Sequence, residues 1–203
     1  QLKVIGKPAD RIDGPLKTTG LAAYAYERHD VVANQAYGFV VGSAIAKGRV
    51  LNIDTRDAKN AAGVVAVLTT LDQPATPPTK SCAVTNFGGA EIHHYHQAVA
   101  LVVADTFEQA RAAAGLIRVE YERVSGKFDL AQEAPNAPIA NSGRKSSHHR
   151  TGDFEAAFAK AEVTVDQTYT TPDESHAMME PHASIAAWQG DKLTVWTSNQ
   201  MIA

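Results

Sequence analysis

The clearest pattern of hydrophobic and polar positions lies in residues 97–122. Residues 98–104 form a continuous apolar run of strand length, which indicates a strand buried on both faces. A helix is expected next, with Asp105 as its N-cap and Glu108 three residues later, close to a capping box. Its apolar stripe recurs at helical spacing and consists of Phe107, Ala110, Ala114 and Ile117. The alternation of charged and apolar residues over 118–122 predicts a half-buried strand, so the segment is βαβ-like.

The rest of the chain predicts short elements separated by turns. Residues 1–20 are punctuated by glycine and proline and predict a loop, and residues 72–81 contain three prolines and predict an exposed loop. Strands are expected at residues 22–26, 36–45, 49–54, 64–69 and 162–170. Short helices are expected at residues 55–62 and 154–161, the second capped by Asp153. Finally, residues 184–189 and 192–197 predict a hairpin around the turn pair Gly190-Asp191.

Residues 125–150 differ from the sequence on either side. Glycine, proline and serine are frequent there, and large apolar side chains are few. Such a composition is typical of a linker between folding units. The order of the elements therefore predicts an α+β fold with a second unit attached beyond the linker.

The composition excludes several classes of function. With 44% hydrophobic and 20% charged residues among 203, the chain can bury a core. Its net charge of -3 leaves no basic excess to bind a nucleic-acid backbone, so no nucleic-acid partner is expected. The apolar stretches are too short to cross a membrane. The single cysteine, Cys82, excludes an internal disulfide, a cysteine-ligated zinc site and an iron–sulfur cluster within this chain.

Four places in the sequence carry residues suited to chemistry. Three histidines at 93, 94 and 96 suggest a zinc site, although the sequence nominates no further ligand, and a polar rim at the entry to a strand is the favoured reading. Phe87-Gly88-Gly89 indicates a turn, since no helix follows to bind a phosphate. Glu180 and His182 flank a proline and suit acid–base work or a polar cluster that anchors a turn; the cluster is favoured. Gln200 follows a strand and offers an uncharged amide donor.

Several motifs, taken in order, resemble one known family. They are Asp13 to Gly20 with Ala23-Tyr24, Gln97 to Ala104, Ala110 to Ala113, Val119 to Glu122, Met179 to Ala183, Trp188, and Thr197 to Gln200. Together they resemble the molybdenum-binding large subunit of the xanthine dehydrogenase/aldehyde oxidase family, and within it the bacterial periplasmic aldehyde oxidoreductases. The resemblance covers nearly the whole chain.

The resemblance implies an order of domains. Residues 1–12 would be an N-terminal extension, residues 13–124 an α/β-hammerhead domain, residues 125–152 a linker, and residues 153–203 the start of the molybdenum-cofactor-binding domain. It also implies an N-terminal part of a longer subunit, whose glycine-rich cofactor loop and catalytic glutamate lie further along. No catalytic residue is therefore expected in this chain, and the chain alone is expected to be inactive.

One site residue carries over from the family. Gln200 matches the glutamine whose amide approaches an oxo ligand of molybdenum, without ligating the metal itself. The implied reaction oxidises aldehydes, with aromatic ones expected, to carboxylic acids with oxygen from water. The implied cofactor is molybdopterin cytosine dinucleotide, with 2Fe-2S clusters and FAD on two partner subunits of a heterotrimer. The implied location is the periplasm.

Three alternatives to this reading stay open. A xanthine- or purine-type hydroxylase of the same family shares the motifs, and the cytoplasm is the alternative location. A non-catalytic assembly module would use the loop at 72–81 and the rim at 93–96 to dock the iron–sulfur and flavin subunits. The third alternative is a zinc site built on the histidines of that rim.

Overall fold

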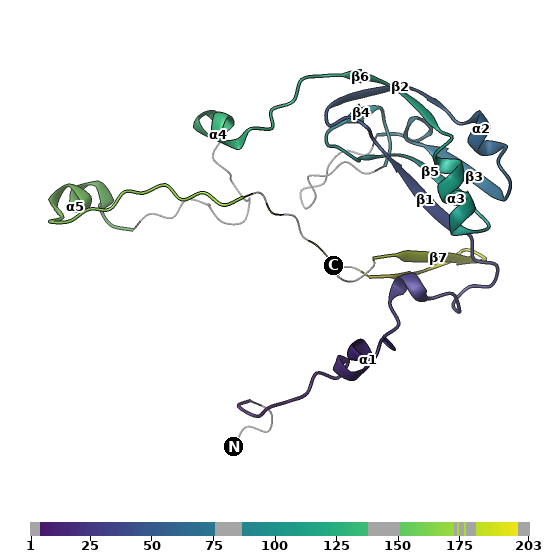
Figure 1. Cartoon of the computed structure of the whole chain (residues 1–203), viewed down its shortest axis with the longest axis horizontal. Coiled ribbons are helices and arrows are strands. Elements are labelled where there is room, and N and C mark those ends of the chain that lie inside the picture. Colours follow the sequence, from purple (N-terminus) through teal and green to yellow (C-terminus); the bar gives the residue numbers. More distant parts are fainter. Residues whose placement is uncertain are drawn as a thin grey trace. The chain divides into compact units, whose positions relative to one another are not determined.

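The computed structural model describes residues 5–75, 87–137, 151–172, 174, 177 and 182–198 (Figure 1). Its contacts divide the chain into two compact units. One comprises residues 36–171, and the other joins residues 1–35 to residues 172–203.

Two three-stranded antiparallel sheets form the unit of residues 36–171. The first sheet has the order β1 (Tyr37–Gly42), β5 (Ala98–Ala104), β3 (Val64–Thr69). The second has the order β4 (Glu91–Ile92), β2 (Gly48–Asp54), β6 (Arg118–Arg123). The helix α3 (Phe107–Ala114) connects β5 of the first sheet to β6 of the second. The βαβ-like prediction was therefore wrong, because the two strands belong to different sheets and local sequence patterns do not specify strand partners.

The helix α3 packs on the first sheet through small side chains. Ala113 and Ala114 lie in a buried cluster with Val102 of β5 and Ala58. Ala58 belongs to the short helix α2 (Arg56–Lys59), which covers part of the predicted helix at 55–62. Alanine at these positions lets the helix backbone approach the strands closely, as close packing of the interior requires.

The N-terminus of α3 begins one residue later than the sequence pattern predicts. Thr106, not Asp105, is the N-cap, and its Oγ1 accepts a hydrogen bond from the Gln109 backbone N–H at 3.2 Å. The Gln109 side chain in turn accepts from the Thr106 N–H at 3.1 Å, which completes a capping box. The prediction failed because two capping residue types stand side by side, and the hydroxyl of Thr106, whose backbone is extended, is the group that reaches the Gln109 N–H.

A second buried cluster involves both sheets. It contains Ile45, Val50, Ile92 and Val99. Buried polar groups beside it are paired: the Ser43 hydroxyl donates to the Ile45 carbonyl at 2.8 Å and accepts from the Ile45 N–H at 3.1 Å. The strands of this unit therefore enclose their own core, and the buried Ser43 hydroxyl beside it is paired.

Three further predictions of local structure were wrong. Residues 22–26 form no strand; instead, η1 (Ala25–Glu27) is a 3-10 turn in which Glu27 accepts a hydrogen bond from the Tyr24 N–H at 3.2 Å. The predicted loop 1–20 contains the short helix α1 (Gly14–Thr18). Residues 162–170 alternate as a strand would, yet in the described structure they join no sheet. Alternation alone does not make a strand, since a strand needs a partner for its backbone groups.

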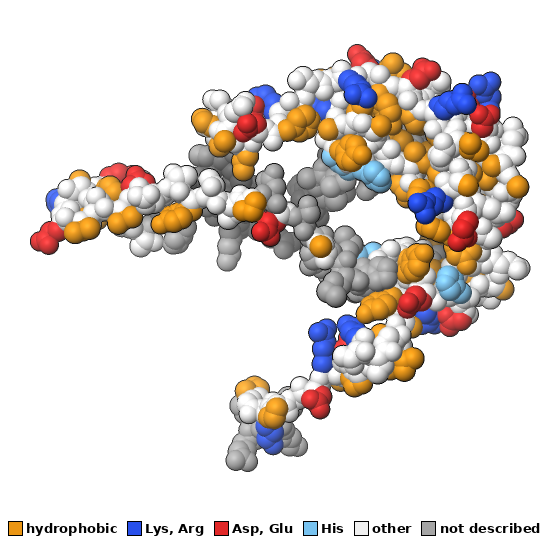
Figure 2. Space-filling model, in the orientation of Figure 1, with side chains coloured by type: hydrophobic (Ala, Val, Ile, Leu, Met, Phe, Trp, Pro, Cys, Tyr) orange, Lys and Arg blue, Asp and Glu red, His pale blue; other side chains and the backbone are white. Residues whose placement is uncertain are grey.

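Short helices occupy the segment that follows β6. They are α4 (Leu130–Glu133), η3 (Ala134–Asn136) and α5 (Phe154–Lys160), and a further 3-10 turn, η2 (Thr70–Asp72), directly follows β3. The α5 helix and its cap confirm the prediction, because Asp153 accepts from the Ala156 N–H at 3.1 Å. Figure 2 shows hydrophobic side chains along this segment, where Phe154 and Val163 are exposed. Within the described residues, no helix has both the length and the apolar character that a membrane span requires.

The predicted hairpin is confirmed in its register and bounds. The strands β7 (Ser184–Gln189) and β8 (Lys192–Thr197) pair antiparallel, with Gln189 opposite Lys192. In the turn, Gly190 has a φ of 63°, whereas Asp191 is not among the residues with positive φ. This is the pattern of a type II′ turn, which matches the twist of the strands it joins.

Candidate functional site

The open end of the β7–β8 hairpin is the part of the described chain that leads to Gln200. The last paired residues, Ser184 and Thr197, share a hydroxyl hydrogen bond at 2.7 Å. One residue further out, the Ser198 N–H donates to the Ala183 carbonyl at 3.3 Å. Beyond that, Nδ1 of His182 lies 3.1 Å from the Ser198 hydroxyl and 3.4 Å from the Ser198 carbonyl oxygen. Polar contacts thus continue past the regular strand pairing.

The groups gathered at this end carry hydroxyls and an imidazole, and no carboxylate. Across residues 182–198 the only carboxylate is Asp191, which lies at the opposite end of the hairpin, in the turn. Hydroxyl and imidazole N–H donors suit a ligand whose outer atoms are electron-rich oxygens, which a carboxylate would repel. The described residues therefore fit the group that the family resemblance implies. Gln200 itself and Glu180 lie outside the described residues.

The rim at residues 93–96 is a turn held together by a neighbouring amide. Gln97 is 6% exposed, and its side chain accepts from the His93 N–H at 2.8 Å and donates to the Glu91 carbonyl at 2.8 Å. His96 adopts a φ of 62°, and its N–H donates to the Ser43 carbonyl at 3.1 Å. Among the described residues no group of three or more His, Cys, Asp or Glu side chains is placed to hold a metal, so the zinc hypothesis gains no support.

The pair Gly88-Gly89 fixes one loop against another. The Gly89 N–H donates to the Gln73 carbonyl at 3.1 Å, and the Thr70 hydroxyl donates to the Gly89 carbonyl at 2.6 Å. Both glycines have positive φ, and a Cβ at Gly88 would overlap the Pro74 carbonyl oxygen. The pair is therefore required by close backbone packing. Residues 76–81 of the predicted exposed loop, and Cys82, lie outside the described residues.

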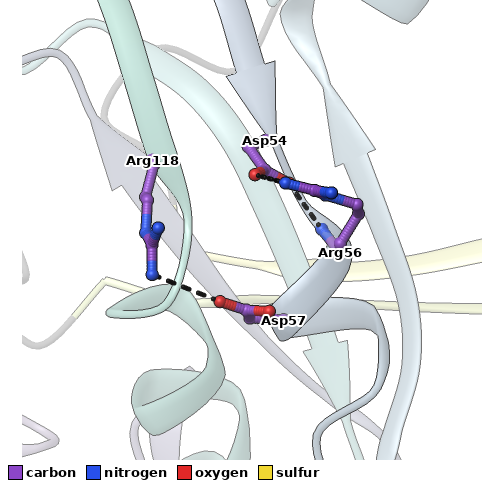
Figure 3. A network of polar contacts seen from close by, with 4 residues as sticks. All are labelled: Asp54, Arg56, Asp57 and Arg118. Carbon is purple, nitrogen blue, oxygen red and sulfur yellow. Dashed lines mark hydrogen bonds and ion pairs between the residues drawn. The ribbon is translucent and has the colours of Figure 1, made fainter.

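One ionic network was missed by the sequence analysis. Figure 3 shows the Arg56 guanidinium turned back onto the Asp54 carboxylate, while Arg118 reaches Asp57. The Arg56–Asp54 contact measures 2.7 Å and the Arg118–Asp57 contact 3.4 Å. Asp54 and Arg118 also face each other in the pairing of β2 with β6. The only signal in the sequence was the D-x-R-D spacing after a predicted strand, and the partner Arg118 follows from strand register alone.

Hydrogen bonds from Arg56 lower the pKa of the Asp54 carboxyl far below its ordinary value of 3.8. The donors are the Arg56 guanidinium and then the Arg56 backbone N–H, and each favours the ionised carboxylate. Conversely, the same contact raises the pKa of Arg56. Since Arg56 is largely exposed, this network orders the start of α2 and is no buried catalytic pair.

Two family models match the chain in succession. The first is described as "Aldehyde oxidase and xanthine dehydrogenase, a/b hammerhead domain" and matches residues 19–125. The second is described as "Molybdopterin cofactor-binding domain" and matches residues 135–203. The chain belongs to the aldehyde oxidase and xanthine dehydrogenase family. The predicted fold class is confirmed: an α+β chain with a hammerhead domain, followed by the start of a molybdenum-cofactor-binding domain. The predicted boundaries at residues 12, 124 and 152 stay predictions.

Individual members of the family resemble the chain to different degrees. Aldehyde oxidoreductase molybdenum-binding subunit PaoC of Escherichia coli is 56% identical, over 100% of this chain and 27% of the relative. A xanthine dehydrogenase molybdenum-binding subunit of Escherichia coli is 30% identical, over 94% of this chain and 27% of the relative. In the solved structure of quinoline 2-oxidoreductase from Pseudomonas putida 86, 28% of that chain superimposes on 99% of this one, with a TM-score of 0.75 and 22% identity. The chain thus spans about a quarter of the length of these relatives.

Proposed function

We propose that the chain forms part of the molybdenum-binding subunit of an aldehyde oxidoreductase. The observation that carries this proposal is its 56% identity with PaoC across the whole chain, against 30% with the xanthine dehydrogenase subunit. The reaction would convert an aldehyde and water into a carboxylic acid, two protons and two electrons. A molybdenum cofactor would supply the redox chemistry, taking up the electron pair that leaves the aldehyde.

The residues of this chain would support that reaction without performing the chemical step. Gln200 would direct its amide N–H toward the oxo group of the cofactor, a contact that an uncharged donor makes without repulsion. The hammerhead domain would serve as scaffold. The finer parts of the proposal are a molybdopterin cytosine dinucleotide cofactor, a heterotrimer with a 2Fe-2S subunit and an FAD subunit, and a periplasmic location. Their support is the resemblance of the motifs and the similarity to PaoC.

Substrate profiling of the complete subunit with its partners tests the proposed reaction. Benzaldehyde, xanthine and hypoxanthine would each be assayed with an artificial electron acceptor. We expect turnover of benzaldehyde to exceed turnover of either purine by at least about a hundredfold, because acceptance of a different scaffold requires a different pocket. Preference for a purine would replace the proposal with a xanthine-type hydroxylase.

Substitution of Gln200 tests its role in the same enzyme. Gln200→Ala should lower kcat by about tenfold or more, since a preorganised donor at a reacting centre is lost. The molybdenum content should stay unchanged, because Gln200 is not proposed as a metal ligand. A Gln200→Ala enzyme with full kcat would remove this residue from the site. The cofactor form would be tested by identifying the nucleotide that the enzyme releases on denaturation. The location would be tested by fractionating the source cells.

A further inference from the structure

One segment with the sequence pattern of a strand has no partner among the described residues. Figure 1 shows the chain after α5 as an extended run, and residues 161–170 are all exposed. No hydrogen bond joins residues 162–170 to another described residue. The backbone N–H and C=O groups of an extended segment are the groups through which strands pair. In this segment they are available to a further strand.

The side chains of this segment divide between an apolar face and a polar face. Val163, Val165 and Tyr169 occupy alternate positions and are 83%, 73% and 87% exposed, and Gln167 is the one polar member of their face. The positions between them all carry polar side chains, namely Thr164, Asp166, Thr168 and Thr170. A strand of an antiparallel sheet shows this division when one of its faces packs on a core and the other lies in water. The apolar face therefore lacks the core that its pattern requires.

The described part of the same domain does not supply that core. Residues 162–170 lie inside the match to the cofactor-binding domain at 135–203, and outside the hammerhead match at 19–125. Both buried clusters of the described chain consist of hammerhead residues. From residue 135 on, Ile185 is the single apolar side chain that is buried among the described residues. Because a folding domain has a core of its own, most of this domain's core must be built by residues other than these.

The rest of the same subunit is the cover that these observations favour. The chain spans 27% of the length of PaoC, and a separate subunit or a second copy would leave the domain without a core until assembly. We propose that residues 162–170 form a strand of the cofactor-binding domain, paired with a strand of the same subunit outside residues 1–203. That part of the subunit also covers Val163, Val165 and Tyr169. This inference rests on the proposed function, since it takes the chain as part of a longer molybdenum-binding subunit.

Amide hydrogen exchange in the complete enzyme tests the pairing. In residues 162–170, either alternate amides or all of them should exchange at least about a hundredfold more slowly than in a free peptide of the same sequence. The reason is that an amide bonded within a sheet exchanges only when the sheet opens. Exchange at the rates of the free peptide throughout the segment would overturn the proposal.

Photochemical cross-linking in the complete enzyme identifies the cover. Val165 or Tyr169 would be replaced by p-azidophenylalanine, and the cross-linked peptides would be identified by mass spectrometry after irradiation. We expect a peptide of the same subunit from outside residues 1–203, in a product with the mass of one subunit. A peptide from residues 1–203, a peptide from a partner subunit, or a product of two identical subunits would overturn the proposal. So would the absence of any product from both positions, because a covered azide reacts with its cover.

A pair of matched substitutions tests the assignment of the two faces. Val165→Asp places a charge on the apolar face and should lower the soluble yield of the complete enzyme by about fivefold or more. Thr164→Asp introduces the same side chain one residue earlier, on the polar face, and should retain most of the yield. Val165→Ile keeps the apolar character and should retain it as well. Equal yields of the two aspartate variants would overturn the proposal.

Substrate preference enters none of these measurements, so the two proposals can fail separately. If the enzyme prefers a purine while residues 162–170 are protected and cross-link as expected, the proposed reaction fails and the strand assignment stands. If benzaldehyde is preferred and the segment exchanges like a free peptide, only the strand assignment fails.

Discussion

The two sheets of the hammerhead and the β7–β8 hairpin bury their apolar side chains to very different degrees. In the hammerhead, Val99 and Val102 of β5 are fully buried, with strands on both sides. In the hairpin, Ile185 is buried, but Trp188 is 68% exposed and Leu193, directly opposite it, is 44% exposed. Two strands alone are marginally stable, whereas sheets that share a core stabilise one another. A destabilising substitution in the hammerhead should therefore affect the stability of both of its sheets, whereas one in the hairpin should affect only β7 and β8.

Alanine at two glycines gives the largest test of this contrast. Gly48 has a φ of 144°, and a Cβ there would overlap the Glu122 carbonyl oxygen of the paired strand β6. Gly48→Ala should lower the free energy of unfolding by about 3 kcal/mol, from backbone strain and steric overlap together. Gly190 also has positive φ but open space around its Cα. Urea unfolding of the 203-residue chain would measure both variants.

Hydrogen exchange shows where each glycine substitution acts. Gly48→Ala should speed amide exchange throughout both hammerhead sheets, whereas Gly190→Ala should speed it only in β7 and β8. Equal effects of the two variants on the hammerhead amides would show that the hairpin and the hammerhead unfold as one cooperative unit, and the contrast would be lost.

A smaller effect is expected at the N-terminus of α3. Thr106→Ala removes the capping hydroxyl and should lower the free energy of unfolding by about 1 kcal/mol. Asp105→Ala is the matched control: it removes the residue that the sequence pattern favours but whose side chain is not the cap. Thermal unfolding of the two variants would measure the difference. A larger loss of unfolding free energy in Asp105→Ala than in Thr106→Ala would show that Asp105 is the N-cap, as the sequence predicts.

The smallest effect is the pH dependence of the Asp54 contact. Because the pKa of Asp54 is lowered in the folded chain, its charge stabilises the fold above the unfolded value of about 4, and this contribution is lost as the pH falls through the folded pKa. Asp54→Asn should therefore be less stable than the unchanged chain near neutral pH, and the difference should shrink below about pH 4. A difference that stays constant down to pH 2 would refute the ionic origin.

Sequence patterns predicted the elements of both regions better than their partners. The hairpin was predicted residue by residue, because alternation and a Gly-Asp turn are local signals. The strands β1, β2, β3, β5 and β6 of the hammerhead were predicted to within a few residues for the same reason, whereas the two-residue strand β4 was not predicted. The assignment of β5 and β6 to different sheets was missed, because it depends on contacts far apart in the sequence. So was the Asp54 network, whose partner Arg118 arrives through strand register.

The candidate site divides in the same way. The resemblance of motifs pointed to Gln200, but no local pattern connects His182 to Ser198, sixteen residues later. That contact appears only once the turn at Gly190 has brought the two ends of the hairpin together. The residue type shows that a side chain can donate a hydrogen bond, but the strand topology determines which acceptor lies close to it.

The position of β5 also has a consequence for biosynthesis. It is the middle strand of β1-β5-β3, and β6, which follows it after α3, completes the other sheet. On a ribosome, β1 and β3 emerge before their shared partner β5 exists, and β2 emerges before its partner β6. Neither sheet has all of its strands until residues 98–123 have left the exit tunnel. Until then the apolar faces of the earlier strands stay exposed, and this is the stage of synthesis at which a chaperone would be needed most.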